Sequence, residues 1–152
     1  AAGKVEAICL RYFNVYGPRQ DPSSPYSGVI SLFTRWALDG KAPNVFGDGN
    51  QTRDFVYVGD VIRANLLAMD AEVSQPGTII NIATGSSISV LDLWKSICEA
   101  GDLPILEANH LPAREGDVLH SVADVQRAKE ILGFTAQVPL AEGLRTTITA
   151  ER

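Results

Sequence analysis

The residues best suited to binding an anion are concentrated in the stretch Phe46–Val61, FGDGNQTRDFVYVGDV. Gly47-Asp48-Gly49 is typical of a turn, because glycines allow positive φ and close approach of the backbone. Arg53 follows at the junction with the apolar run Phe55–Val58, which predicts a strand. A planar, permanently charged guanidinium at such a junction suits capture of a phosphate or carboxylate. The alternative is a surface ion pair between Arg53 and Asp54 without a ligand.

Three further features could grip an anionic sugar or nucleotide. Asn14 ends an apolar run, at the edge where α/β sheets bind ligands, and its amide can both donate and accept. Arg114 lies beside a glycine turn, and Asp117 could orient it or accept from a sugar hydroxyl. Asn44-Val45-Phe46 predicts a short strand whose free edge could meet a flat ring. The alternatives are a turn-forming asparagine, a polar surface loop and a strand without a ligand.

The sequence contains no motif typical of a metal site, a catalytic nucleophile or a dinucleotide-binding loop. His110 and His120 lack metal-ligand spacing to each other and to the cysteines. There is no Gly-x-Ser-x-Gly elbow and no Gly-Lys-Ser/Thr phosphate loop. Gly47-x-Gly49 precedes a strand, whereas a dinucleotide-binding loop follows one. No tyrosine has a lysine four residues later, so we identify no catalytic residue and no metal site.

The composition is that of an ordinary globular domain. The 152 residues are 45% hydrophobic and 20% charged, and they carry a net charge of −5. This charge argues against a general nucleic-acid or anionic-membrane binder, and no apolar run has membrane-spanning length. Cys9 and Cys98 lie in apolar runs, which predicts buried free thiols in a reducing, cytoplasmic compartment.

Strand and helix patterns alternate along the chain, which predicts an α/β layered fold. We expect buried strands over residues 5–13 and 78–83, and shorter strands over 44–46, 55–58 and 103–107. Residues 14–18 should form a turn after the first strand. We expect helices over residues 28–39, 61–70, 89–101 and 124–132, and a last helix from 139 onward.

Two of these helices have clear start signals. Asp60 is predicted to cap the helix beginning at Val61, and its buried stripe should be Ile62, Leu66 and Met69. Ser89 should begin the next one, with Asp92 as its capping-box partner. A doubly wound domain needs several consecutive βαβ units, whereas these patterns supply about two strands of such a sheet. We therefore expect the second half of a larger protein.

Several motifs follow one another in an order that identifies a family. They are LRYFNVYGPRQ over residues 10–20, GDGNQTRDFVYVGDV over 47–61, NIATG over 81–85 with SVL over 89–91, REGD over 114–117 with SVAD over 121–124, and LGF over 132–134. This series resembles the C-terminal half of the NAD-dependent sugar-nucleotide epimerase/dehydratase family, the extended short-chain dehydrogenases. The resemblance covers nearly the whole chain. The stretches over 19–22 and 26–30 look most like UDP-hexose and UDP-N-acetylhexosamine 4-epimerases.

The resemblance implies one strand of a partial Rossmann-like, doubly wound sheet joined to the small α/β substrate-binding domain of these enzymes. Residues 1–152 would then be a single substrate-binding domain, with residues 1–17 a remnant of the parallel-sheet NAD-binding domain. The family's glycine-rich NAD loop and its Tyr-x-x-x-Lys base belong to the N-terminal half, which this sequence lacks.

The resemblance also implies roles for individual residues. The backbone around Tyr12 and Phe13 would lie beside the nicotinamide, and Asn14 would contact the diphosphate-sugar. Val29 would wall the nucleotide.

The remaining implied roles concern the base, the ribose and the phosphates. Asn44 and Phe46 would flank the uracil. Arg53 and Arg114 would grip the two phosphates, with Asp117 near the ribose.

The expected function is therefore the nucleotide-sugar-binding half of a UDP-sugar 4-epimerase-like enzyme, which inverts sugar C4 through NAD. NAD belongs to the intact family, and we expect this chain alone to bind none and to be inactive. Its expected partners are a UDP-sugar and either a missing N-terminal half or a second copy, joined through residues 4–13. The alternatives are a non-catalytic nucleotide-sugar-binding or docking module and half of a 4,6-dehydratase or decarboxylase.

Overall fold

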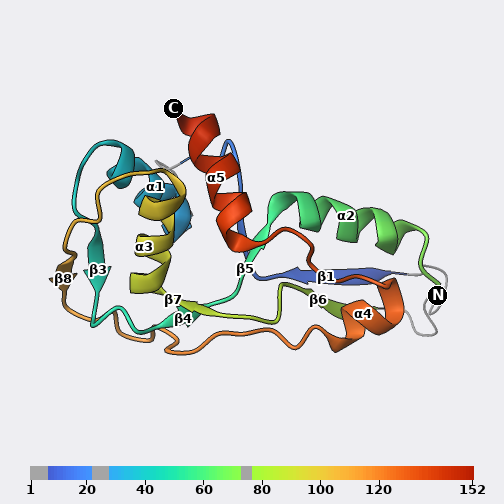
Figure 1. Ribbon diagram of the computed structural model, residues 1–152. Coiled ribbons are helices and arrows are strands. Elements are labelled where there is room, and N and C mark those ends of the chain that lie inside the picture. The colour runs from blue at the N-terminus through green and yellow to red at the C-terminus, as the bar shows by residue number, and fades with distance from the viewer. Residues whose placement is uncertain (1–6, 22–27, 73–76) are drawn as a thin grey trace.

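The computed structural model describes residues 7–21, 28–72 and 77–152. Its helices are α1 (Val29–Leu38), α2 (Val58–Met69), α3 (Val90–Ala100), α4 (Gln126–Leu132) and α5 (Leu140–Glu151). Its strands are β1 (Ile8–Tyr12), β2 (Asn14–Tyr16), β3 (Asn44–Phe46), β4 (Thr52–Arg53), β5 (Phe55–Tyr57), β6 (Thr78–Ile82), β7 (Ile88–Ser89) and β8 (Asn109–Leu111). The alternation of strands and helices confirms the predicted partial α/β fold (Figure 1).

A parallel pair of strands, β1 and β6, forms the first packing unit. The pair runs in register from Ile8 opposite Thr78 to Tyr12 opposite Ile82. Helix α2 lies along β1 and helix α4 along β6 (Figure 1). Between them, Ile80 and Ile82 are fully buried. A parallel pair covered by helices is the arrangement expected of a doubly wound sheet.

The prediction of a buried first strand is wrong for β1. Alternate residues of β1 are exposed, and Tyr12 is 45% exposed. Among the described residues only β6 pairs with β1, so its other edge carries no partner strand. The expected residues 5 and 6 of that strand lie outside the described ranges. The boundary predicted at residue 17 stays a prediction.

The second packing unit is built from α1, α3 and α5. Trp94 and Ile97 of α3 are buried against Leu144 and Ile148 of α5, as the helical spacing predicted. The indole Nε1 of Trp94 donates to the Leu106 carbonyl at 2.9 Å, which closes the loop after α3 onto the core. Burying a large indole with its N–H satisfied is the stable way to place tryptophan in a core.

The predicted helix ends are largely confirmed. Ser89 Oγ accepts the N–H of Asp92 at 3.1 Å, which forms the expected N-terminal cap of α3. Helix α4 begins at Gln126, two residues after the predicted start, and Asp124 Oδ1 accepts the N–H of Gln126 at 2.9 Å just before it. Gly133, with φ of 61°, ends α4 in the left-handed conformation that favours glycine.

The prediction for α2 is wrong in two respects. The helix begins at Val58, after Tyr57, and Asp60 lies inside its first turn with 2% exposure, so Asp60 is not the N-cap. The stripe expected to be buried faces outward instead, with Ile62, Leu66 and Met69 exposed by 57%, 58% and 80%. The buried face is formed by Val61 and Ala64, because small side chains let a helix approach the sheet closely.

Three other local predictions are corrected by strand pairing. Residues 14–16 form β2, parallel to β5, and not a turn. Residues 103–107 form no strand, and β8 follows them at Asn109–Leu111. β8 pairs parallel with one edge of β3, and no described strand pairs with the other edge, so the predicted role of β3 beside a flat ring stays a prediction.

The two cysteines differ in exposure. Cys98 is buried, as predicted, whereas Cys9 on β1 is exposed, and both are free thiols. Across the described ranges, none of the helices combines the length and the hydropathy that crossing a membrane requires. The same residues contain no group of three or more His, Cys, Asp or Glu arranged to hold a metal.

Candidate functional site

Every residue that was predicted to bind substrate lines one pocket of about 510 Å³. These residues come from the start of β2, the start of α1, β3, β4 and the loop after β8: Asn14, Val29, Asn44, Phe46, Arg53, Arg114 and Asp117. Residues as far apart in the sequence as Asn14 and Asp117 therefore meet at one place. This grouping is a geometric finding, and the individual roles stay predictions.

Helix α1 supplies the apolar wall of the pocket. Val29, Leu32, Phe33 and Trp36 all line it, at the i, i+3, i+4, i+7 spacing of one helical face. The sequence predicted a role for Val29 alone. The same helical spacing could have identified Leu32, Phe33 and Trp36 as lining residues, but this spacing is equally typical of a helix face packed into the core.

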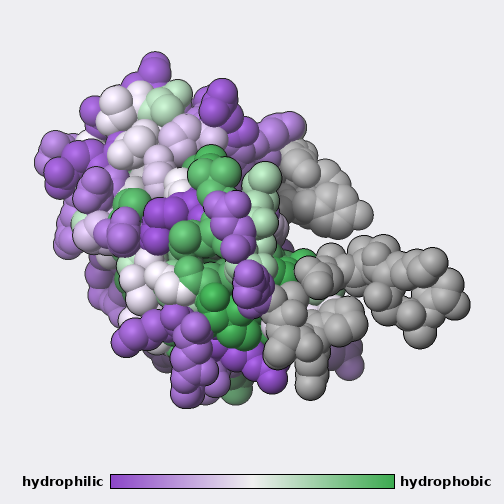
Figure 2. All heavy atoms as spheres, turned by 90° about the vertical axis from the view of Figure 1, so that its right-hand side faces the viewer, coloured by the Kyte–Doolittle hydropathy of each residue, from purple (hydrophilic) through white to green (hydrophobic). Residues whose placement is uncertain are grey.

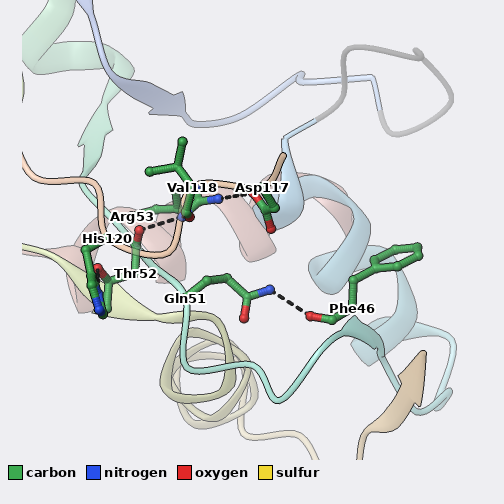
Figure 3. A network of polar contacts seen from close by, with 7 residues as sticks. All are labelled: Phe46, Gln51, Thr52, Arg53, Asp117, Val118 and His120. Atoms are coloured by element: carbon green, nitrogen blue, oxygen red, sulfur yellow. Dashed lines mark hydrogen bonds and ion pairs between the residues drawn. The ribbon is translucent and has the colours of Figure 1, made fainter. Parts of the chain in front are cut away.

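Arg53 projects from β4 into the pocket with a side chain that is only 18% exposed. Its Nη1 donates to the carbonyls of Thr52 at 2.8 Å and Val118 at 2.6 Å, and its Nη2 pairs with Asp117 Oδ1 (Figure 3). An arginine has five N–H donors. Among the described residues, the Nε–H and one Nη2–H remain available for a ligand.

Two sequence-based alternatives are wrong in the light of these contacts. Arg53 does not pair with Asp54, which is fully buried, and it pairs with Asp117 instead. Asp117 therefore orients Arg53 and not its near neighbour Arg114. Both errors arose because the sequence suggested only partners close by in the chain.

Arg114 stacks on an aromatic ring at the rim of the pocket. Its guanidinium carbon lies 3.8 Å from the centre of the Phe46 ring. The Phe46 carbonyl in turn accepts a hydrogen bond from Gln51 Nε2 at 2.9 Å (Figure 3). Cation–π contact holds the guanidinium plane over one face of the ring. The pocket thus combines a flat apolar surface with two cations, which suits a ligand made of a planar base and phosphates.

Asn14 and Asn44 both contribute amide groups to the pocket lining. Asn14 Nδ2 donates to the Asp54 carbonyl at 3.0 Å, and no described residue donates to its Oδ1. Asn44 Oδ1 accepts from Asn109 Nδ2 at 3.3 Å, across the β3–β8 pair. Each amide is thereby oriented by the protein and keeps capacity to bond a ligand.

The two residues predicted to lie near a nicotinamide occupy different surroundings. Phe13 continues from β1, and its N–H donates to the Ile82 carbonyl at 3.1 Å. The Tyr12 hydroxyl donates to Asn65 Oδ1 on α2 at 2.9 Å, in a hollow between β1 and α2. Neither residue lines the pocket described above, and the predicted nicotinamide contact concerns their backbone.

The glycine turn does not fit a dinucleotide. Gly49 has φ of 78°, and a Cβ placed there would lie 2.5 Å from Cγ of Leu91 and 3.0 Å from Cγ1 of Val45. The space beside the turn is therefore filled by side chains and leaves no room for a pyrophosphate. The turn also connects two strands, β3 and β4. The turn therefore lacks the strand-to-helix setting in which a dinucleotide-binding loop lies.

Comparison with known proteins identifies the family. A sequence model described as the NAD dependent epimerase/dehydratase family matches residues 1–83. The chain belongs to this family.

Relatives within the epimerase/dehydratase family include enzymes of more than one type. A Methanocaldococcus jannaschii protein proposed to be a UDP-glucose 4-epimerase is 44% identical over 145 residues, which are 95% of this chain and 45% of the relative. A UDP-N-acetyl-alpha-D-glucosaminuronate decarboxylase of Bacillus cytotoxicus is 37% identical in an alignment of 145 positions that covers 91% of this chain and 44% of the relative. The chain spans about half the length of the curated relatives it matches.

Solved structures in the epimerase/dehydratase family share the fold of this chain. The UDP-glucose 4-epimerase of Thermotoga maritima with UDP-glucose has a TM-score of 0.88 and 44% identity, and the match covers 95% of this chain and 45% of that one. The UDP-glucose 4-epimerase of Thermus thermophilus in complex with NAD has a TM-score of 0.82 and 34% identity, covering 94% of this chain and 45% of that one.

Proposed function

We propose that this chain is the nucleotide-sugar-binding half of a UDP-sugar 4-epimerase, an enzyme that inverts sugar C4 with NAD. The observation that carries the proposal is the pocket of about 510 Å³ that holds Arg53, Arg114 and the Phe46 ring together. The similarity to an epimerase whose structure holds UDP-glucose supports the same assignment.

In this proposal, different pocket residues contact different parts of the ligand. The free N–H groups of Arg53 and the guanidinium of Arg114 would bind the diphosphate through charge-assisted hydrogen bonds. The uracil would lie against Phe46 and the wall formed by α1. Asp117 would lie near the ribose and Asn14 near the diphosphate-sugar. Because the chain as a whole carries a charge of −5, this local pair of cations is what attracts an anionic ligand.

The chemistry itself lies outside what these residues supply. In the intact family, NAD accepts a hydride from C4 and returns it to the other face of the sugar. The residues of this chain would bind and orient the nucleotide-sugar, and they offer no Tyr-x-x-x-Lys base. We therefore expect no turnover of UDP-glucose or UDP-N-acetylglucosamine when NAD is added to this chain alone. Turnover above a boiled control contradicts that expectation.

Titration calorimetry with UDP tests the proposed binding function. We expect a saturable heat for UDP and for UDP-glucose, with weaker binding of ADP, because the proposal assigns the surface beside Phe46 to a uracil. Equal binding of ADP would argue against a uracil site at Phe46. The absence of saturable UDP binding up to about 10 mM, a standard binding free energy of roughly −2.7 kcal/mol, would contradict the proposal.

A decarboxylase is the second candidate, supported by the relative from Bacillus cytotoxicus. A decarboxylase half would bind a UDP-uronic acid more tightly than UDP-glucose, because a further cation would meet the sugar carboxylate. The same titration with UDP-glucuronic acid distinguishes a decarboxylase half from the half of an epimerase that acts on UDP-glucose. A non-catalytic module would also bind UDP-sugars, and it would differ in remaining inactive when supplied with the complementary NAD-binding half of a relative.

A further inference from the structure

Asp54 is a fully buried carboxylate that the binding function does not itself use. Its exposed fraction is 0%, and no lysine, arginine or histidine pairs with it in the described ranges. Oδ1 accepts from the N–H of Thr84 at 2.9 Å and from its Oγ1 at 2.6 Å. Oδ2 accepts from the N–H groups of Gly85 at 2.9 Å and Ala123 at 3.2 Å. Burial of a charge is tolerable only when each of its lone pairs is satisfied in this way.

These four bonds join three segments that are distant in the sequence. Thr84 and Gly85 follow β6, and Ala123 ends the loop that carries Asp117. Asp54 lies between β4 and β5 and directly follows Arg53. One carboxylate therefore fixes the separation between β4 and the loop of residues 117–123.

That loop runs beside β4 and holds the partners of Arg53. The N–H of Thr52 donates to the Leu119 carbonyl at 2.8 Å, and the N–H of Ser121 donates to the Thr52 carbonyl at 3.2 Å. Asp117 and the Val118 carbonyl then contact the Arg53 guanidinium (Figure 3). The Ala123 anchor lies at the end of this run, so a shift there would move both groups that orient Arg53.

The backbone of Asp54 fixes the opposite side of the pocket. Its carbonyl accepts the backbone N–H of Asn14 at 3.2 Å and the side-chain Nδ2 of Asn14 at 3.0 Å. Asn14, Arg53 and Asp117 thus all depend on the placement of one residue that does not line the pocket.

We propose that Asp54 is a positioning residue of the pocket, which sets the direction of the Arg53 guanidinium toward the diphosphate of the ligand. The inference rests on the proposed nucleotide-sugar function. An Asp54→Asn substitution tests it, because an amide cannot accept at both positions. Whichever way the amide turns, its NH₂ faces at least one backbone N–H group that needs an acceptor, either that of Thr84 or those of Gly85 and Ala123.

Asp60 offers a matched control. It is 2% exposed, and its carboxylate accepts the N–H groups of Gln137 and Val138 at 3.0 Å and pairs with Arg63 at 2.8 Å. None of these four residues lines the pocket. Asp60→Asn should therefore destabilise the fold in a comparable way without changing the direction of Arg53.

The first readout is the ratio of UDP affinity to uridine affinity, measured by calorimetry on the full chain. Loss of a charge-assisted phosphate contact should lower UDP affinity about tenfold in Asp54→Asn and leave uridine affinity within about twofold. The ratio should be unchanged in Asp60→Asn. An unchanged ratio in Asp54→Asn, or an equal fall in both variants, overturns the proposal.

The second readout needs no ligand, so it separates this inference from the proposed function. Hydrogen exchange at the amides of Thr52, Ser121 and Ala123 should accelerate about tenfold in Asp54→Asn. In Asp60→Asn, exchange at these three amides should change only as much as the free energy of global unfolding changes. If the wild-type chain binds no UDP, the proposed function fails, and the exchange comparison alone decides whether Asp54 holds the loop. Equal acceleration in both variants overturns the positioning role.

A milder pair of variants covers the case in which Asp54→Asn does not fold. Thr84→Val removes the 2.6 Å bond from Oγ1 to Asp54 and keeps the backbone N–H donor. It should lower the UDP-to-uridine ratio and accelerate exchange at Ala123, and Thr84→Ser should restore both. Failure of Thr84→Val to change either one contradicts the proposal.

Discussion

Asp117 forms an ion pair with Arg53 across 64 residues of sequence, at the rim of the candidate pocket. The Arg53 side chain is 18% exposed and that of Asp117 34%, so the pair is partly shielded from water. The pair holds one edge of the guanidinium and leaves the remaining N–H groups available to a ligand. A phosphate bound at this site would meet an arginine that is already oriented, which would lower the entropy lost on binding.

Removing either pocket arginine should weaken UDP binding. Each of Arg53→Ala and Arg114→Ala deletes charge-assisted hydrogen bonds worth about 1.5–3 kcal/mol, which is roughly a ten- to hundredfold loss in affinity. Arg127→Ala is the control, because Arg127 contacts the Ile79 carbonyl and lies outside the pocket. Calorimetry measures all three. UDP binding that survives both pocket substitutions would mean that the phosphates bind elsewhere.

Sequence patterns predicted correctly those features that depend only on residues close together in the chain. The Ser89–Asp92 cap and the Trp94–Ile97 stripe of α3 were correct, because both depend on residues three or four apart. The residues that the family motifs assigned to substrate binding line one pocket, and their roles stay predictions. The Arg53–Asp117 pair was missed, because no local pattern marks a contact between such distant positions.

The face of α2 was assigned wrongly for a related reason. Periodicity shows that Ile62, Leu66 and Met69 share one face, and large apolar residues usually face inward. In this fold the inward face consists of smaller residues, including Ala64, which is fully buried. Asp60 was predicted to be an N-cap because no nearby residue in the sequence indicates its actual hydrogen bonds, which come from the backbone N–H groups of residues 137 and 138.

The exposed face of α2, and the edge of β1 that no described strand pairs with, lead us to predict self-association. Figure 2 shows hydrophobic surface gathered on the face that includes the end of α2 and the β1–β6 pair. We expect a second copy to pair along residues 4–13, because an open strand edge recruits other chains. Light scattering at micromolar concentration should show association that Ile8→Lys reduces. Val122→Lys is the control, since Val122 is 54% exposed and lies in another part of the chain. A monodisperse wild-type monomer contradicts the expectation.

Gly143 in α5 should not tolerate a larger side chain. A Cβ there would lie 2.2 Å from the Tyr16 hydroxyl and 3.0 Å from Cδ2 of Tyr57. Gly→Ala in a helix usually gains about 1 kcal/mol, but overpacking costs roughly 1–3 kcal/mol. We expect Gly143→Ala to lower the free energy of unfolding in urea denaturation. The loss should shrink in a Tyr16→Phe background, which removes the nearest atom. Stabilisation by Gly143→Ala alone would show that the close approach is absent.

The two thiols should differ in reactivity. Burial raises the pKa of the Cys98 thiol to about 11, and its side chain is fully buried, whereas Cys9 is exposed. Since the thiolate is the reactive form, iodoacetamide at neutral pH should modify Cys9 and spare Cys98 until the chain unfolds. Peptide mass spectrometry locates the label, and Cys9→Ser should abolish labelling of the native protein. Equal modification of both cysteines in the native state would contradict the packing of α3.

Mapping UDP onto the chain by NMR tests the central claim most directly. In a titration of the isotopically labelled protein, the account predicts saturable chemical-shift changes at the amides of Phe46 and Gln51 and at the side-chain Nε–H of Arg53 and Arg114. Residues around the β1–β6 pair, such as Ile80, should not shift. Changes centred on the β1–β6 pair, or none at the pocket up to about 10 mM UDP, would contradict the assignment of this pocket as the nucleotide-sugar site.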